Sequence, residues 1–356
     1  MKLLVCGGAG FIGSSFVRQR LREHGDEVVV LDKLTYAGRE ESLQDVRDEP
    51  GFAFLRGGIE DADRVAEALA GCDAIVNFAA ETHVDRSISE PDAFITTNGR
   101  GTYVLLEAAR ERGLRHVQVS TDEVYGSIAE GTFTEDSPLR PSSPYSASKA
   151  GADLLVSSYF HTFGLEALIC RGSNNYGPFQ YPEKLIPLMI LNALAGDPLP
   201  VYGDGMNVRN WIHVEDFCRA VGTVLERGEP GAVYNAGGPD ECPNLQVVRR
   251  ILELCGRDEA LIELVPDRLG HDPPVFPHLA DLAPAPPQSL VALVHGGVEL
   301  PPAEVDLDLR VGEPLQLRAR GGHRPVVAEL AIDALDELDV LPRHGQSRNA
   351  RPYWRS

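Results

Sequence analysis

The sequence predicts an α/β fold built on a doubly wound parallel sheet, with a smaller α/β lobe attached. Three observations lead to this prediction. A short apolar strand at 2–6 runs directly into a glycine-rich turn and a helical segment. A second apolar strand, 28–31, ends in an acidic residue. Strands and helices then alternate over roughly the first 170 residues, as they do when helices cover both faces of a parallel sheet.

The glycine-rich turn has the spacing GxxGxxG, formed by Gly7, Gly10 and Gly13. Such glycines allow a tight turn, close approach of the backbone to a pyrophosphate, and close packing of the helix on the strand. Asp32 follows roughly 20 residues later, where a carboxylate binds an adenosine ribose. Because a carboxylate repels a 2′-phosphate, the order strand, glycines, helix, strand and acid predicts an NAD site rather than an NADP site.

Further strands are expected at 52–55, 74–79, 115–120 and 166–170. The predicted organisation has three parts. Residues 1–172 and 206–237 form a Rossmann-type NAD-binding domain, residues 173–205 and 238–272 form the substrate lobe, and residues 273–356 form a divergent tail.

Thr121, Asp122 and Glu123 directly follow the strand predicted at 115–120. Ligands of open α/β sheets bind at the carboxyl ends of the strands. A hydroxyl, a carboxylic acid and a carboxylate at such a position are the groups needed to eliminate water. The alternative is an ordinary polar turn, since exposed acidic pairs are common.

Tyr145 and Lys149 are four positions apart at the start of a segment with helical periodicity, so they share one helix face. A free tyrosine has a pKa near ~10. A neighbouring ammonium and a positive nicotinamide ring both favour the phenolate, so the pair predicts a base that works near neutral pH. The alternative is a plain helix start with a surface Tyr and Lys.

A series of longer stretches carries a resemblance to a known family. They are GGAGFIG (7–13), LDKLTYAG (31–38), NFAAETHVDRSI (77–88), STDEVYG (120–126), PYSASKA (144–150), RGSNNYGP (171–178), EKLIPL (183–188), LPVYGDGMNVRNWIHVEDF (199–217) and NAGGPDECPN (235–244). In these stretches the chain resembles the dTDP-glucose 4,6-dehydratases, extended short-chain dehydrogenases/reductases of the NAD-dependent epimerase/dehydratase family. The resemblance covers residues 1 to about 272 in the family's order.

The resemblance implies a lyase that acts on the nucleotide sugar dTDP-glucose with tightly bound NAD. Tyr145 would take the proton of the carbon-4 hydroxyl as hydride leaves, with Lys149 and Thr121 holding the phenolate and the hydroxyl. Glu123 would then remove the carbon-5 proton while Asp122 protonates the departing carbon-6 hydroxyl. Hydride returns to carbon 6, so NAD is regenerated rather than consumed.

The resemblance also implies binding residues. The cofactor would contact Gly7, Gly10, Phe11, Ile12, Gly13, Asp32, Lys33, Thr35, Ile59, Ala79, Ala80, Thr82, Asn98, Tyr145 and Lys149. The substrate would contact His83, Thr121, Asn174, Lys184, Arg209, Asn244, Arg268 and His271. Lys and Arg suit phosphate because they are charged donors, and a solvated surface position is their alternative. For Asn98, a helix cap is the simpler account.

The chain departs from the family pattern at Gly58. The family has an aspartate before Ile59 that contacts the adenine, and glycine has no side chain to do so. The sequence therefore predicts that this hydrogen bond is lost, at a cost of about 1 kcal/mol in NAD binding.

The family's closing segment is not recognisable after Asp272, where clustered prolines oppose both helix and strand formation. Our hypothesis is a reading-frame error or a fusion junction. Resequencing of the gene tests it, because an uninterrupted frame that encodes the same tail would refute it. The alternative is a genuine appended module with valine- and leucine-rich strands between 289 and 330.

The composition points to an enzyme of the cytoplasm. The net charge of -20 disfavours nucleic acid and anionic membranes as partners. The six cysteines lack CxxC or histidine spacing, which predicts reduced packing residues and no metal site. No apolar run is long enough for a signal peptide or a membrane span. Helices near 100–112 and 148–163 resemble those that pair in the family's dimers, so a homodimer is expected.

Two alternatives to the dehydratase remain. A UDP-sugar epimerase or decarboxylase of the same superfamily keeps the glycine turn and the Tyr/Lys pair. An epimerase needs no further acid and base, so Asp122 and Glu123 speak against it. The other alternative is an inactive NAD-binding paralogue, suggested by Gly58 and the divergent tail.

Overall fold

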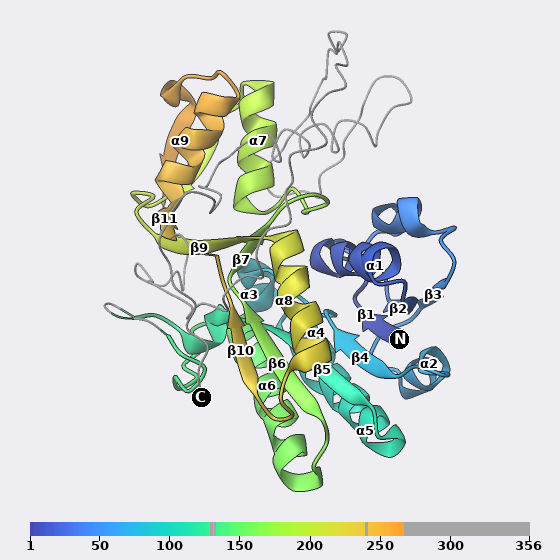
Figure 1. Ribbon diagram of the computed structural model, residues 1–356. Helices are drawn as coiled ribbons and strands as arrows, with labels where there is room; N and C mark the ends of the chain where they lie inside the picture. The colour runs from blue at the N-terminus through green and yellow to red at the C-terminus, as the bar shows by residue number, and fades with distance from the viewer. Residues whose placement is uncertain (129–130, 132, 239–240, 267–356) are drawn as a thin grey trace, which may run out of the picture.

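The computed structural model describes residues 1–266 except 129–130, 132 and 239–240 (Figure 1). Its main feature is a seven-stranded parallel sheet in the order β10-β6-β5-β4-β1-β2-β3. The strands are β1 (Lys2–Cys6), β2 (Glu27–Asp32), β3 (Phe52–Arg56), β4 (Ala74–Asn77), β5 (Arg115–Thr121), β6 (Ala167–Gly172) and β10 (Val233–Ala236). The predicted α/β fold with a doubly wound parallel sheet is therefore confirmed.

The central strands are apolar because helices cover both of their faces. In β1, Leu3, Leu4 and Val5 are fully buried. β4 ends at Asn77, earlier than predicted, where the Asn77 side chain accepts a hydrogen bond from the amide of Ala79 at 3.1 Å. The strand order reverses between β1 and β4, so the connections leaving their carboxyl ends diverge and leave room for a ligand.

Helices form a layer on each face of the sheet (Figure 1). α1 (Phe11–Glu23) and α8 (Val214–Arg227) pack together on one face. α2 (Ala62–Ala68), α5 (Thr102–Arg112) and α6 (Pro144–Phe163) pack on the other. Each layer closes its own apolar core against the strands, which leaves only the strand ends open to a ligand.

α6 begins at Pro144, next to the start predicted at Tyr145 from the helical periodicity. A capping box explains this start, because the Ser143 hydroxyl accepts from the amide of Ser146 at 3.1 Å and the Ser146 hydroxyl accepts from the amide of Ser143 at 3.0 Å. Pro144 occupies the first helical position, where it loses no hydrogen bond. Tyr145 consequently lies in the first helical turn.

Shorter helical elements fill the connections. They are η1 (Glu40–Val46), α3 (Val84–Ser89), α4 (Pro91–Phe94), the π-helix η2 (Ile95–Gly101), η3 (Asp122–Tyr125) and η4 (Glu259–Leu261). α4, η2 and α5 follow one another directly along the chain. The cap residues between them have helical dihedral angles, so they form one continuous helical rod with a π-type middle turn.

A smaller lobe stands at the end of the sheet, where Figure 1 shows α7 and α9. α7 (Leu185–Ala195) and α9 (Asn244–Leu254) pack together and share a separate apolar core. Two small sheets complete this lobe, one of β11 (Glu241–Pro243), β9 (Val208–His213) and β7 (Asn174–Tyr176), and one of β12 (Ile262–Val265) and β8 (Leu199–Tyr202).

The segment 206–237 is divided between the seven-stranded sheet and the three-stranded sheet of the smaller lobe. β9 pairs with β7 and β11, whereas α8 and β10 belong to the seven-stranded sheet. The domain boundaries stay a prediction. The tail 273–356, with the strands expected between 289 and 330, lies outside the described residues. Within the described residues, no helix combines the length and apolar composition needed to cross a bilayer. All six cysteines are free thiols.

A buried ion pair joins α6 to β6. Asp153 is 1% exposed and Arg171 5% exposed, and the Arg171 Nε donates to the Asp153 carboxylate at 2.9 Å. Arg171 also donates to the Tyr125 hydroxyl at 2.7 Å, and that hydroxyl donates to the Asn235 side chain at 2.7 Å. The network therefore ties η3 to two strands and one helix.

Asp153→Ala is expected to lower the free energy of unfolding by about 3–5 kcal/mol, because it leaves the Arg171 guanidinium buried without its carboxylate. Glu67→Ala is the control, since it breaks the exposed Arg64–Glu67 pair, which contributes under about 1 kcal/mol. Urea unfolding followed by circular dichroism measures both. Equal losses in the two variants would contradict a structural role for the buried pair.

Candidate active site

The glycine turn is packed too tightly for any larger side chain. Gly7 has a left-handed φ of 74°, and a β-carbon there would lie 2.5 Å from the amide nitrogen of Ala79. A β-carbon on Gly13 would overlap the Gly7 carbonyl oxygen and lie 2.9 Å from the Gly8 Cα. α1 starts at Phe11, so its free amide groups face this turn. The tight glycine turn and the free amide groups at the start of α1 fit a pyrophosphate.

Asp32, the last residue of β2, lies directly against this turn. One of its carboxylate oxygens accepts from the amide of Ala9 at 2.9 Å and the other from the amide of Leu34 at 2.8 Å. Burial raises the pKa of Asp32, and the two amide hydrogen bonds oppose this shift. Its position beside the pyrophosphate turn fits a ribose hydroxyl.

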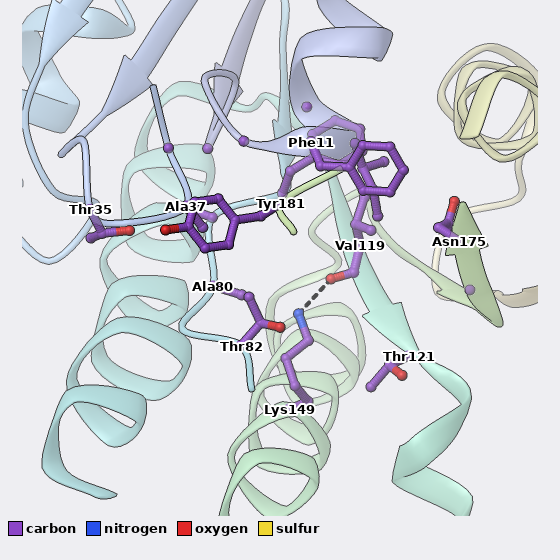
Figure 2. Close-up of a pocket in the computed structure, with 18 of the residues that line it drawn as sticks. Phe11, Thr35, Ala37, Ala80, Thr82, Val119, Thr121, Lys149, Asn175 and Tyr181 are labelled. Atoms are coloured by element: carbon purple, nitrogen blue, oxygen red, sulfur yellow. Dashed lines mark hydrogen bonds between the residues drawn. The ribbon is translucent and has the colours of Figure 1, made fainter. Parts of the chain in front are cut away.

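One pocket runs from the glycine turn to the smaller lobe (Figure 2). Nearly all of the predicted cofactor residues line it: Gly7, Gly10, Phe11, Ile12, Gly13, Asp32, Lys33, Thr35, Ile59, Ala79, Ala80, Thr82, Tyr145 and Lys149. Together with the shape of the glycine turn, this set fits a dinucleotide.

Asn98 is the predicted cofactor residue that does not line the pocket. It lies inside η2 and is 2% exposed, so the helix-cap account is wrong. Its side chain accepts from the amide of Glu81 at 2.9 Å and donates to the Glu81 carbonyl at 3.2 Å and to the Ser148 hydroxyl at 2.9 Å. Asn98 therefore braces the segment after β4 against α6 from behind the pocket wall.

Thr121, Asp122 and Glu123 lie at the carboxyl end of β5, as predicted, and all three line the pocket. Thr121 ends the strand and its hydroxyl caps η3 by accepting from the amide of Glu123 at 3.3 Å. The same hydroxyl donates to the Asp122 carboxyl group at 3.2 Å. This short helical turn brings the hydroxyl and both carboxyl groups to one wall.

The two carboxyl groups have different environments. Asp122 is 7% exposed, and its pKa is raised to about 7 by burial and then by the neighbouring Glu123. Arg209 and the Thr121 hydroxyl oppose the shift. Glu123 is exposed. One member of the pair is thus half protonated near neutrality, which is the state that a general acid requires.

Lys149 and Tyr145 face the same pocket from α6. Lys149 is 4% exposed and donates to the Val119 carbonyl at 2.7 Å (Figure 2). Burial lowers its pKa to about 8, against the attraction of Asp153. Both residues were predicted to share one helix face, and they do.

The protein groups around Tyr145 raise its pKa, whereas the prediction of a lowered pKa also relied on a positive nicotinamide ring. Burial raises the pKa, the carboxyl groups of Glu123 and Asp122 raise it further, and a hydrogen bond with Thr121 lowers it. The ammonium of Lys149 donates to the Val119 carbonyl and is not among the main groups that shift this pKa. The protein groups alone therefore disfavour the phenolate.

The structure brings only some of the predicted substrate residues into the pocket lining. Asn174 and Lys184 line the pocket with Thr121. Asn174 donates to the Asn210 carbonyl at 3.1 Å, and the Lys184 ammonium donates to the Thr82 hydroxyl at 3.3 Å. Lys184 thus reaches from the smaller lobe to the segment after β4, whereas Asn174 bonds to β9 within the lobe.

Arg209, Asn244 and His83 lie outside the pocket lining. Arg209 donates to the Val208 carbonyl at 2.9 Å and acts on Asp122 through its charge. Asn244 is the first residue of α9. His83 precedes α3 with a left-handed φ of 97°, a conformation rare for a residue with a β-carbon. Arg268 and His271 lie outside the described residues.

Some lining residues were not predicted from the sequence, among them Glu60, Tyr181 and Glu183. The Tyr36 hydroxyl donates to Glu183 at 3.0 Å, and the Tyr181 ring meets the Tyr36 ring edge-on at 5.5 Å. Figure 2 shows Tyr181 beside Ala37. Tyr36 and Glu183 lie inside motif stretches, but their contact joins segments far apart in the chain, so the sequence gives no direct signal for it.

Gly13→Ala is expected to weaken NAD binding. The β-carbon meets backbone rather than a movable side chain, and displacing the turn costs about 2 kcal/mol, a Kd higher by roughly 30-fold. Gly151→Ala is the control, because its β-carbon would meet no atom within 4 Å. Calorimetric titration with NAD compares the variants. Unchanged affinity in Gly13→Ala would remove the turn from the binding site.

The parallel sheet, the glycine turn with Asp32 and the Tyr145/Lys149 pair in one pocket define an extended short-chain dehydrogenase/reductase. The family described as GDP-mannose 4,6 dehydratase matches residues 4–260, and the chain belongs to this family.

Relatives agree with this assignment. The low-salt glycan biosynthesis protein Agl12 of Haloferax volcanii is 55% identical over 273 residues, which cover 76% of this chain and 88% of that protein. A dTDP-glucose 4,6-dehydratase of Streptomyces niveus is 52% identical over 278 residues, covering 76% and 83%. DesIV, a dTDP-glucose 4,6-dehydratase of Streptomyces venezuelae solved with NAD and TYD bound, has a TM-score of 0.75 and 52% identity, covering 76% of this chain and 86% of that one.

Proposed function

We propose that this chain is a hydro-lyase that dehydrates dTDP-glucose to dTDP-4-keto-6-deoxyglucose with tightly bound NAD. The observation that carries the proposal is the acidic pair of Asp122 and Glu123 in the same pocket as Tyr145 and Lys149. Relatives named dTDP-glucose 4,6-dehydratase, at about half identity, support the same reaction. The seven-stranded sheet would hold NAD and the smaller lobe the nucleotide diphosphate.

The first step is oxidation at carbon 4. The glycine turn and Asp32 would hold NAD, which would supply the hydride acceptor for carbon 4 and later the hydride for carbon 6. Tyr145 takes the proton of the carbon-4 hydroxyl, and Thr121, in hydrogen-bond contact with Tyr145, orients that hydroxyl. The buried Lys149 holds positive charge on the same helix face.

The second step is elimination of water. The new ketone at carbon 4 acidifies the carbon-5 proton, which Glu123 accepts. Asp122 donates its proton to the carbon-6 hydroxyl, which leaves as water, so the double bond forms between carbons 5 and 6. The raised pKa of Asp122 keeps that proton available near neutral pH.

An epimerase is the second candidate. A UDP-glucose 4-epimerase of Thermus thermophilus, solved with NAD, is 32% identical with a TM-score of 0.69, covering 76% of this chain and 88% of that one. An epimerase has no use for an acid with a pKa near 7 beside an exposed carboxylate. An inactive paralogue is disfavoured because all five catalytic residues line the pocket.

Turnover in heavy water tests the proposal. Purified chain incubated with dTDP-glucose should yield a product that has lost one water and carries deuterium at carbon 5, with no net NADH. Mass spectrometry and NMR read out the product. An epimerised sugar of unchanged composition would replace the proposal by the second candidate. Absence of turnover with intact NAD binding would favour the inactive paralogue.

The rate of water loss is expected to fall as pH rises through about 7. Asp122 must be protonated to act as the acid, and its pKa is about 7. The active form is therefore present below that pH and decreases about tenfold per pH unit above it. Single-turnover measurement of water loss across pH checks this expectation. A rate that stays constant up to about pH 9 would exclude Asp122 as the proton donor.

We also propose a homodimer formed through α5 and α6. Large apolar side chains are exposed on these helices and on η2, namely Ile95 at 60%, Tyr103 at 48%, Leu154 at 61% and Phe163 at 54%. Exposed apolar patches of this kind mark interaction surfaces. Light scattering should give twice the chain mass for the native protein and the chain mass for Leu154→Glu. A monomeric native protein would refute the dimer.

A cytoplasmic location is the accompanying proposal. It is supported by six free cysteines, five of them buried, which a reducing compartment maintains. Fractionation of cells that express the tagged chain tests it, and recovery in a secreted fraction would contradict it.

A further inference from the structure

The loop after β3 lies at the far end of the pocket from the catalytic residues. β3 is the edge strand beside β2, and its last residue, Arg56, is paired in register with Asp32. The amide of Gly57 then donates to the Asp32 carbonyl at 3.0 Å. Gly57, Gly58, Ile59 and Glu60 therefore follow directly beyond the position that fits the ribose, and all four line the pocket.

Glu60 fills the space that a side chain at position 58 would need. A β-carbon built on Gly58 would lie 2.5 Å from both Glu60 carboxylate oxygens and from the carbon between them. The absence of a side chain at Gly58 is thus what admits the Glu60 carboxylate. Positions 58 and 60 offer alternative ways to present an acid at the same place.

One oxygen of the Glu60 carboxylate lacks a hydrogen-bond donor in the part of the chain that the structure describes. This oxygen, Oε2, is buried. Arg64, one turn along on α2, pairs instead with Glu67 at 2.9 Å. A buried acceptor without a donor is costly, by an amount that a ligand with an N–H group would recover.

The order of groups along the pocket identifies that donor. The glycine turn fits the pyrophosphate and Asp32 fits the ribose, so the next group outward, over β3, is the purine base. Adenine carries an exocyclic amino group, which donates hydrogen bonds. We infer that Glu60 accepts a hydrogen bond from the adenine amino group of NAD, in place of the carboxylate that Gly58 lacks.

This inference rests on the proposed use of NAD. It changes the expectation that Gly58 costs the chain its contact with adenine. The contact is kept, and its acid is supplied from two residues further along the loop. The chain should therefore discriminate between bases that carry an amino group and bases that carry an oxygen at the same position.

The test uses the full chain freed of dinucleotide and titrated with NAD and with nicotinamide hypoxanthine dinucleotide, which has a carbonyl oxygen in place of the amino group. The native chain should bind NAD about tenfold more tightly, the value of one hydrogen bond to a charged group. Glu60→Ala should bring the two dissociation constants within about twofold of each other, because the acceptor is gone.

A second variant tests the geometry without removing the acid. Gly58→Ala adds a β-carbon that pushes the Glu60 carboxylate aside, so it should lose the preference for NAD as Glu60→Ala does. Gly58→Asp should keep the preference, because it supplies its own acceptor. Glu67→Ala is the matched control, an exposed glutamate on the following helix that is outside the pocket lining, and should behave as the native chain.

The outcomes separate this inference from the proposed function. Retention of the full NAD preference in Glu60→Ala would overturn the inference, whatever the catalytic result. Loss of preference in Glu60→Ala and Gly58→Ala would support it even in a chain that fails to dehydrate dTDP-glucose. A native chain that binds both dinucleotides equally would also overturn it.

Discussion

Glu123→Gln is expected to abolish formation of the dehydrated sugar while leaving oxidation at carbon 4 intact. The glutamine amide cannot accept the carbon-5 proton, and loss of a general base costs about 10²- to 10⁴-fold in rate. Glu123 is exposed in the first turn of η3, and glutamine keeps the size of its side chain. Reduced cofactor should then accumulate on the enzyme and absorb at the wavelength of NADH.

Exchange of the carbon-5 proton with solvent distinguishes the role of Glu123 from that of Asp122. In heavy water, Glu123→Gln should place no deuterium at carbon 5, whereas Asp122→Asn should still exchange that proton and yet release little water. Both variants replace a carboxyl group by an amide of the same size at adjacent positions, so each is the control for the other. Native product yield from Glu123→Gln would remove Glu123 from the role of base.

Tyr145→Phe is expected to stop the reaction one step earlier. Without the phenol oxygen no group accepts the carbon-4 hydroxyl proton, so the rate should fall by about 10²- to 10⁴-fold and no reduced cofactor should form. The ring remains packed edge-on against Phe94 with centroids 6.3 Å apart. NAD affinity and thermal stability should therefore stay near the native values.

The readout for Tyr145→Phe is absorbance of bound NADH in a single turnover, together with NAD titration. Tyr103→Phe is the control, since that tyrosine is exposed on α5, far from the pocket lining. If Tyr145→Phe accumulates reduced cofactor at the native rate, the proton acceptor for carbon 4 is another group.

Local pattern was enough to predict the framework of the site. The strand at 2–6, the glycine turn and Asp32 follow from periodicity and spacing, because a turn this tight admits only glycine. Thr121, Asp122 and Glu123 were placed correctly because the strand before them ends in a recognisable alternation. Each of these features depends on neighbours in the sequence.

Contacts between distant segments are the reason why the structure departs from some of the predictions made from the sequence. Asn98 is predicted to contact the cofactor, with a helix cap as the simpler account, but its side chain reaches Glu81 and Ser148 from inside η2. The protein groups raise the pKa of Tyr145, because burial and then the carboxyl groups of Glu123 and Asp122 in η3 disfavour the phenolate. Neither effect can be read from residues close in sequence.

The sequence alone determined the α/β fold, the order of the dinucleotide motifs and the presence of an acid, a base and a redox tyrosine. The resemblance gave Asp122 the role of acid, but only the tertiary structure decided how that residue keeps its proton, since burial and then the neighbouring Glu123 raise its pKa. The tertiary structure also decided that Glu60 occupies the space above Gly58. The reason is common to both: protonation and side-chain placement depend on solvent exclusion and close approach, which arise only when separate segments pack.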